Sequence, residues 1–411
     1  PGLIDISARL GEPSHQHTDN ITSETKAAAK GGITTLCIPP DTDPVIDIPA
    51  VVELIQDRAK HCQRTKIYTI GALTQGLKGE LLSEMLSLKQ AGCLGISNGL
   101  QQIDNTLVLR RAMEYAATLD FTLFINAADP WLQSQGCIHE GMVSSRLGLG
   151  GIPEAAETIA ISRYLLLIEH VGVNAHFHNI SCGKSVKLIK EAQERGLAIT
   201  ADVSAHHLHL SEHDIGNYDS LSHVIPPLRS TRDREQLQQG VREGVISVIS
   251  SHHLPLSNDE KLGPFAETCQ GISGLETLLA LTLKLVDDDE LSLEQAISNL
   301  SQKPAQVLGI DAGHFIRLRE RLAIKHLDMT LGRKSLALID KIIAHHTGHF
   351  EVEPLLCNHR SERLSTGLRI NAAGIGDDFD TLPGDFLEIG FYCCRNKIHG
   401  IAGLRIFCSR S

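Results

Sequence analysis

The sequence predicts an α/β protein built on a (β/α)8 TIM barrel, followed by a C-terminal region without an assigned fold. Eight short apolar runs with β-strand character recur over residues 3–251, and stretches with helical periodicity separate most of them. Strands that alternate with helices form right-handed βαβ units and a parallel sheet. Eight such units within about 250 residues close most naturally into a barrel. No GxGxxG motif follows the first run to favour an open, doubly wound sheet instead.

Each expected element follows from its local pattern. Strands are expected at residues 3–6, 34–38, 66–73, 93–97, 121–126, 174–181, 198–204 and 246–251. Helices are expected at 48–61, 79–91, 106–119, 153–171, 184–195 and 231–244, with closing helices at 271–283 and 291–308. The barrel should therefore span residues 1–312. Residues 313–411 have weak periodicity, which leaves a small appended unit, a remnant of a β-sandwich or a poorly ordered tail as alternatives.

Composition excludes several classes of protein. A net charge of -11 without a sustained Lys/Arg stripe argues against a nucleic-acid partner. No apolar run approaches the roughly 20 residues that cross a bilayer, so we expect no membrane partner. The chain begins at Pro1 without a visible secretory signal and is expected to be a fragment. Cysteines without a CxxC pair are typical of reduced thiols in the cytoplasm.

The first strand is followed by the most informative segment. Residues 1–13 read PGLIDISARLGEP, at the strand end where a barrel builds its active site. This segment resembles the PGxxDxHxHxRxP signature of cyclic amidohydrolases, and dihydroorotase in particular. Similarity continues through residues 24–27, 31–35, 40–44, 141–143, 152–157, 226–229 and 271–274, and so covers roughly residues 1–310. The resemblance implies a barrel of the metal-dependent amidohydrolase type.

The positions that bind the metal pair in that family hold other residue types here. The resemblance places Ser7 and Arg9 at two histidine ligands, Asn98 at a bridging aspartate or carboxylated lysine, Asn126 and Asn179 at two further histidines, and His252 at the proton-transferring aspartate. Amides are poor substitutes for imidazole on zinc. We therefore expect no bound metal, no cofactor and no catalytic residue at these degenerate positions.

The substrate side is altered as well. The resemblance implies an arginine, two asparagines and a histidine around dihydroorotate, where this chain has Gly11, Asp41, Ile225 and Leu256. An anionic substrate would meet a carboxylate without its arginine, which predicts loss of binding.

Arg9 is the replacement whose structural role is easiest to anticipate. A guanidinium placed where two cations would lie can mimic their charge. We expect Arg9 to pair with Asp5 or with another carboxylate near the barrel mouth; the alternative is a solvated arginine.

The chain is rich in histidine, so a different metal site has to be considered. If Asn179 points inward, the period of two in a strand turns His176 and His178 to the other face unless a bulge intervenes. Three more histidines follow the seventh strand and are expected to be polar residues of a rim loop rather than ligands: His206, His207 and His209.

The resemblance extends to non-catalytic dihydroorotase homologues that associate with the aspartate transcarbamoylase catalytic chain in pyrimidine biosynthesis. It implies a structural subunit of a cytoplasmic hetero-oligomer. The alternative is an active zinc-dependent dihydroorotase, or a related cyclic amidohydrolase, with an altered site. A metal-free barrel that senses a pyrimidine metabolite is a third hypothesis.

Overall fold

The computed structural model describes residues 2–12, 20–62 and 64–313, and the backbones of four later strands. The chain divides into two compact units, residues 1–316 and 317–411, which are described separately. The boundary that the sequence predicts after residue 312 stays a prediction, because residues 314–351 lie outside the described ones.

The first unit contains the predicted barrel. Eight parallel strands pair in the order β1-β2-β3-β4-β5-β8-β9-β10. A parallel bridge between Ala8 and His253 joins the first strand segment to the last. The strands are β1 (Leu3–Asp5), β2 (Ile33–Ile38), β3 (Lys66–Ala72), β4 (Gly95–Ser97), β5 (Thr122–Ile125), β8 (Ala175–Phe177), β9 (Ile199–Ser204) and β10 (Val248–Ser250). Each lies within or overlaps one of the eight expected runs, so the predicted fold is confirmed.

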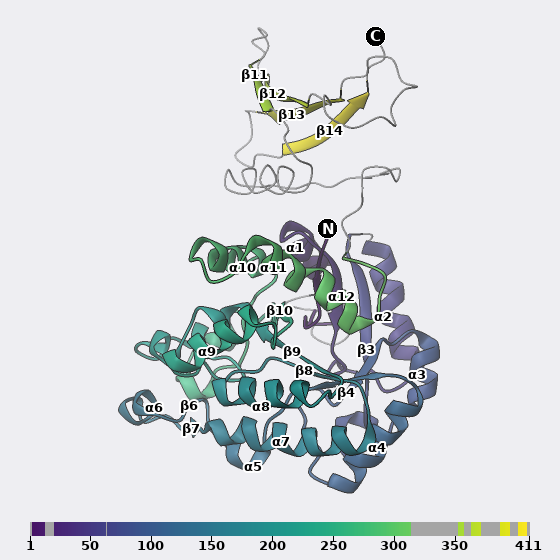
Figure 1. The fold of residues 1–411 in the computed structure, drawn as a ribbon, viewed down its shortest axis with the longest axis vertical. Helices are drawn as coiled ribbons and strands as arrows, with labels where there is room; N and C mark the ends of the chain where they lie inside the picture. Colours follow the sequence, from purple (N-terminus) through teal and green to yellow (C-terminus); the bar gives the residue numbers. More distant parts are fainter. Residues whose placement is uncertain are drawn as a thin grey trace. The chain divides into compact units, whose positions relative to one another are not determined.

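Helices lie around the outside of the strands in Figure 1. Their bounds are α1 (Ile21–Lys30), α2 (Pro49–Cys62), α3 (Met85–Ala91), α4 (Thr106–Thr118), α5 (Pro130–Gln133), α6 (Met142–Leu147), α7 (Glu154–Val171), α8 (Gly183–Glu194), α9 (Thr231–Arg242), α10 (Leu278–Asp287), α11 (Leu293–Leu300) and α12 (Gln302–Leu308). Within the described ranges, no helix combines the length and apolar character needed to cross a membrane.

Helix α1 and an insertion between β5 and α7 are not among the elements predicted from the sequence. Helix α1 begins at a capping box in which the side chain of Asn20 accepts from the amide of Ser23 and the Ser23 hydroxyl accepts from the amide of Asn20. An insertion between β5 and α7 carries α5, α6 and a two-stranded parallel ribbon, β6 (Ile138–His139) and β7 (Gly151–Ile152). These strands are only two residues long, which is too short for a period to be recognised in the sequence.

The barrel has an outer and an inner apolar cluster. Outward-facing strand residues such as Leu123 and Ile125 pack with buried side chains of the surrounding helices. The inner cluster joins side chains of five strands to two residues of α12: Ile4, Ile6, Cys37, Ile70, Phe124, Val248, Ala305 and Leu308. Along β5 the alternation places Phe124 inside and so directs Asn126, two residues later, toward the barrel mouth. The strand period therefore aims the strand-end residues at a common centre.

The second unit is described through the backbones of four strands. They are β11 (Val352–Leu356), β12 (Arg363–Ile370), β13 (Leu387–Cys394) and β14 (Ala402–Cys408), and they form an antiparallel sheet in chain order. No fold is predicted for this region from the sequence, and the four strands show that it contains β-structure.

Candidate functional site

Asp5 is the anchor of the site at the end of β1. Its side chain is fully buried and accepts hydrogen bonds from the Ser251 amide at 3.0 Å, from the Ser251 hydroxyl and from the Ser7 amide at 3.4 Å. Burial raises the pKa of Asp5, although these donors oppose the shift. The contacts tie the end of β1 to the end of β10, so the Asp5 carboxylate is used for closing the ring.

Arg9 forms an ion pair with Asp41 across the barrel mouth. Nη2 of Arg9 lies 2.7 Å from Oδ2 of Asp41, and Nε lies 3.1 and 3.2 Å from the two carboxylate oxygens. The side chains are only 12% and 17% exposed. Pairing with Asp5 and a solvated arginine are both wrong, and the expected pairing with another carboxylate at the mouth is confirmed. Arg9 and Asp41 thus neutralise each other.

The three asparagines at predicted ligand positions are engaged elsewhere. Oδ1 of Asn98 accepts from the Thr74 hydroxyl at 2.6 Å, while its Nδ2 donates to the carbonyls of Leu77 and Gln101. Nδ2 of Asn126 donates to the Gly99 carbonyl at 3.0 Å. Asn179 accepts from the amide of Ser204 through Oδ1, and its Nδ2 lies 3.5 Å from the Ile225 carbonyl. Each amide therefore stabilises the backbone of a strand-end loop.

His252 is buried and neutral at the end of β10. Burial, and then the positive charge of Arg9, hold the pKa of His252 well below its ordinary value. Its Nε2 has no hydrogen-bond partner among the described residues. Its ring centroid lies 6.4 Å from that of His206. His252 therefore keeps an unpartnered but weakly basic imidazole nitrogen in the barrel mouth.

Two of the four substrate-side positions are already engaged with other residues. Asp41 is held by Arg9, and Ile225 offers its carbonyl to Asn179. Gly11 and Leu256 lie in the loops after β1 and β10. Of the three histidines expected in a rim loop, His206 and His207 are buried beside the Ser204 hydroxyl. The third, His209, contacts the Leu281 carbonyl.

Sequence reasoning missed a cluster inside the barrel. His176 and His178 face inward, because β8 pairs His176 with the inward-facing Phe124 and alternates regularly, whereas Asn179 departs from the alternation with a left-handed φ of 51°. Both imidazoles meet Asp202 of β9: Nε2 of His176 lies 3.0 Å from Oδ2, and Nδ1 of His178 bonds the same oxygen. The available signals were the His-x-His spacing and an acidic residue inside an apolar strand.

The Asp202 carboxylate is charged and fully hydrogen-bonded. Oδ1 accepts from the Asn179 amide at 2.9 Å and from the Ser250 hydroxyl at 3.1 Å. Burial alone would raise the pKa of Asp202, but His178 and His176 hold it well below its ordinary value. Burial in turn lowers the pKa of His176. These three groups could hold a metal ion, so the predicted absence of metal is not confirmed.

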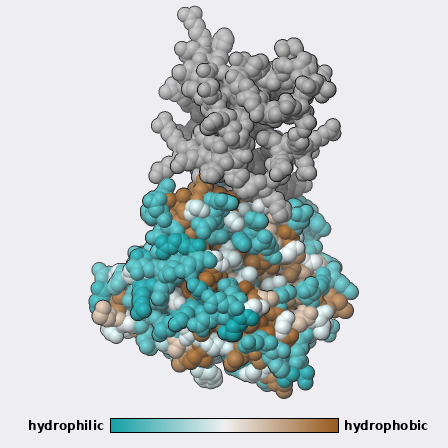
Figure 2. Space-filling view, in the orientation of Figure 1, coloured by the Kyte–Doolittle hydropathy of each residue, from teal (hydrophilic) through white to brown (hydrophobic). Residues whose placement is uncertain are grey.

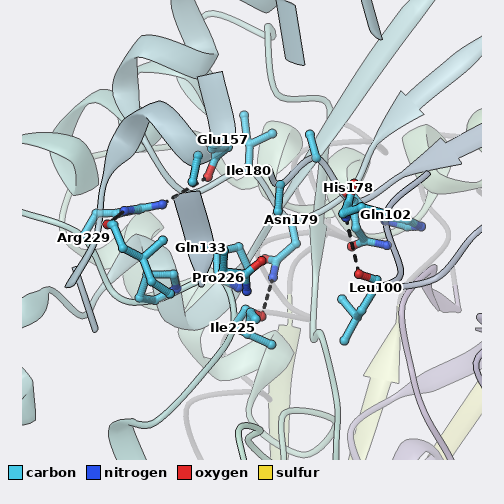
Figure 3. A pocket seen from close by; sticks show the side chains of 16 residues that line it. Leu100, Gln102, Gln133, Glu157, His178, Asn179, Ile180, Ile225, Pro226 and Arg229 are labelled. Atoms are coloured by element: carbon cyan, nitrogen blue, oxygen red, sulfur yellow. Dashed lines mark hydrogen bonds and ion pairs between the residues drawn. The ribbon is translucent and has the colours of Figure 1, made fainter. Parts of the chain in front are cut away.

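An open pocket of about 580 Å³ lies beside this cluster (Figure 3). Asn126, His178, Asn179 and Ile225 all line it, so the structure brings three of the predicted degenerate positions together with His178. One wall is closed by Arg229, which is almost fully buried and donates to the Ser181 hydroxyl at 3.0 Å and the Ile152 carbonyl at 2.6 Å. The pocket is therefore polar on the side of the strand ends.

Comparisons with known proteins agree with this fold. A family model described as dihydro-orotase-like matches residues 1–185. A "Dihydroorotase-like protein" of Pseudomonas putida is 49% identical over 313 residues, 76% of this chain and 74% of that protein. The chain belongs to the dihydroorotase-like family. A "Dihydroorotase" of Desulforapulum autotrophicum is 40% identical over 76% of this chain and 73% of that protein.

The fold of this dihydroorotase-like chain also matches solved structures. L-hydantoinase (dihydropyrimidinase) of Arthrobacter aurescens superposes with a TM-score of 0.66 at 21% identity, covering 75% of this chain and 71% of that one. At this identity the likeness shows the fold alone.

The family's metal pair does not fit the residues present at the strand ends. Arg9 brings a guanidinium, which has no lone pair to donate and is already paired with Asp41. Each of the three amides forms at least one hydrogen bond to a neighbouring chain group. His252 alone offers an unpartnered imidazole nitrogen among these degenerate positions. A dinuclear site needs nearly all of its ligands together.

Proposed function

We propose that this chain is a non-catalytic dihydroorotase homologue that acts as a structural subunit with the catalytic chain of aspartate transcarbamoylase. Its setting would be de novo pyrimidine biosynthesis in the cytoplasm. The observation that carries the proposal is the Arg9–Asp41 ion pair, which fills one metal-ligand position and one substrate position with oppositely charged groups that pair with each other. In a site arranged in this way, the barrel mouth stays stable but no longer supports hydrolysis.

The site chemistry supports the absence of hydrolysis. Attack on a cyclic amide needs a hydroxide made at neutral pH by bound metal, and a base to manage its proton. Asn98, Asn126 and Asn179 supply neither, since amides do not ionise. The carboxylate of dihydroorotate would approach Asp41, whose charge is balanced by Arg9 and leaves no free arginine to bind it.

The surface supports a role in assembly. Figure 2 shows hydrophobic patches between hydrophilic areas on one face of the barrel unit. On the insertion between β5 and α7, Trp131 is 81% and Met142 is 83% exposed. Tryptophan and methionine are enriched at protein interfaces. We propose that this insertion contributes to the contact with the transcarbamoylase chain.

An active amidohydrolase is the competing hypothesis. It is favoured by relatives that are 37–40% identical and carry the name dihydroorotase. Under that hypothesis the purified chain binds zinc at the strand ends and hydrolyses dihydroorotate. Under our proposal it does not turn over dihydroorotate, with or without added zinc.

The decisive experiment combines an activity assay with co-expression. The chain is produced with and without a transcarbamoylase catalytic chain from the same organism, and the mass of each species is measured by light scattering. We expect a stable hetero-oligomer and no hydrolysis. Turnover of dihydroorotate by the chain alone, or two separate species at micromolar concentration, contradicts the proposal.

Surface variants test the proposed contact. Trp131→Glu and Met142→Glu should each weaken the complex at least tenfold, because a charge placed in a buried contact is left unpaired. Leu262→Glu is the matched control, since Leu262 is 73% exposed but lies in another loop. If all three variants bind alike, the contact lies elsewhere.

A further inference from the structure

Three side chains inside the barrel converge on one point. His176 and Asp202 are fully buried, and His178 is 6% exposed. One nitrogen of each imidazole and one oxygen of the carboxylate lie within 4.8 Å of one another. We propose that His176, His178 and Asp202 bind a single divalent transition-metal ion of the zinc class. This site differs from the strand-end positions of the metal pair, because none of its ligands occupies one of them.

The ligand atoms need little movement to hold such an ion. Tetrahedral zinc, with bonds of about 2.0–2.2 Å, keeps its ligand atoms about 3.3 Å apart. Nε2 of His176 is 3.0 Å from Oδ2 of Asp202, close to that separation. The His178–Asp202 contact is shorter and must open slightly. Two imidazoles and a carboxylate are also a donor set that zinc prefers.

The outer atoms of the cluster are held as metal ligands usually are. Nδ1 of His176 lies 2.7 Å from the Thr200 hydroxyl, so its proton can be donated there while Nε2 faces the ion. Oδ1 of Asp202 is fixed by the Asn179 amide and the Ser250 hydroxyl. These partners aim Nε2 and Oδ2 at the common point, and neither has to be given up when the ion binds.

Proton balance also permits binding. Zinc binds the neutral form of imidazole, whose single proton then lies on the nitrogen that faces away from the ion. That nitrogen is Nδ1 in His176 and Nε2 in His178, because the other nitrogen of each ring faces Asp202. His178 lines the pocket, and its hydrogen bond to Asp202 uses Nδ1 and leaves Nε2 for the ring proton. The pocket gives the ion a path inward, and water from it supplies the fourth ligand.

The test measures metal on the isolated full chain, without a partner protein. Apo protein is titrated with zinc against a chromophoric chelator, and with cobalt(II) to record its visible spectrum. We expect His178→Gln to bind one zinc fewer per chain than the wild type. We also expect a four- or five-coordinate cobalt spectrum that lacks a thiolate charge-transfer band. The difference between proteins is the readout, because residues 314–411 contain further His and Cys.

His252→Gln is the matched control, since it removes a buried histidine at a strand-end position. It should keep the wild-type stoichiometry. A zinc ion lost in His252→Gln but kept in His178→Gln overturns the proposal, as does equal stoichiometry in all three proteins. If His178→Gln does not fold, Thr200→Val replaces it and should bind zinc at least tenfold more weakly; unchanged affinity overturns the proposal. Neither result bears on the association with transcarbamoylase.

Discussion

Breaking the Arg9–Asp41 pair should destabilise the barrel by about 2 to 3 kcal/mol. Arg9→Met keeps most of the side-chain stem but leaves the Asp41 carboxylate unpaired, and Asp41→Asn leaves the guanidinium unpaired. A fully buried pair that loses one partner costs about 3–5 kcal/mol, and an exposed pair costs about 0–1 kcal/mol. The observed exposures of 12% and 17% place this pair between the two, nearer the buried limit.

Urea unfolding followed by far-ultraviolet circular dichroism measures this effect. With a slope of about 3 kcal/mol per molar urea, each single variant should unfold about 1 M earlier. The double variant R9M/D41N should lose less than the sum of the singles, with a coupling energy of about 2 kcal/mol. Single losses below about 0.5 kcal/mol, or strict additivity, would show that the pair is solvated and would refute its role in filling the site.

Three further outcomes test other parts of the structure. Burial chiefly lowers the pKa of His207 from 6.5 to about 4, so the unfolded chain binds the proton more tightly. The contribution of His207 to stability is therefore complete above about pH 6.5 and falls below it, by about 1.4 kcal/mol per pH unit; His207→Gln should remove this part of the fall in urea titrations at pH 7 and 5. Gly274→Ala places a Cβ 2.5 Å from the Ser251 carbonyl oxygen and should cost about 1–3 kcal/mol; an unchanged urea midpoint would show that the loop is free to shift. Phe124→Ala should cost about 3–5 kcal/mol, and a loss under 1 kcal/mol would mean that Phe124 is not part of the inner core.

The barrel could be predicted because its signals are local. The run 34–38, for example, carries apolar side chains on both faces, Leu36 and Ile38 on one and Cys37 on the other, as expected for a strand between an inner core and a helical layer. Helix α1 was missed although its capping box, Asn20 and Ser23, is visible in the sequence. The β6–β7 ribbon could not be found, because a two-residue strand depends on its partner rather than on its own pattern.

The sequence predicted which ligand residues of the site are replaced, but not the contacts that the replacing residues make. The replacement of ligand types at Ser7, Arg9 and Asn98 can be read from the sequence alone. The partner of Arg9 cannot, because Asp41 lies on a neighbouring strand-end loop and competes with Asp5, which Ser251 already satisfies. Whether Arg9 pairs with Asp5 or with Asp41 depends on distances that only the closed barrel sets.

The sequence by itself determined the barrel and the residue types at its strand ends, because strand period and residue chemistry act over a few neighbouring positions. Only the tertiary structure decided that His176 and His178 face inward to Asp202. The register pairs His176 with Phe124, which belongs to the inner cluster, so the ordinary alternation of β8 turns His176 and His178 inward. The left-handed φ of Asn179 follows both histidines and redirects Asn179 alone, so Asn179 could not be used to deduce the face of the two histidines.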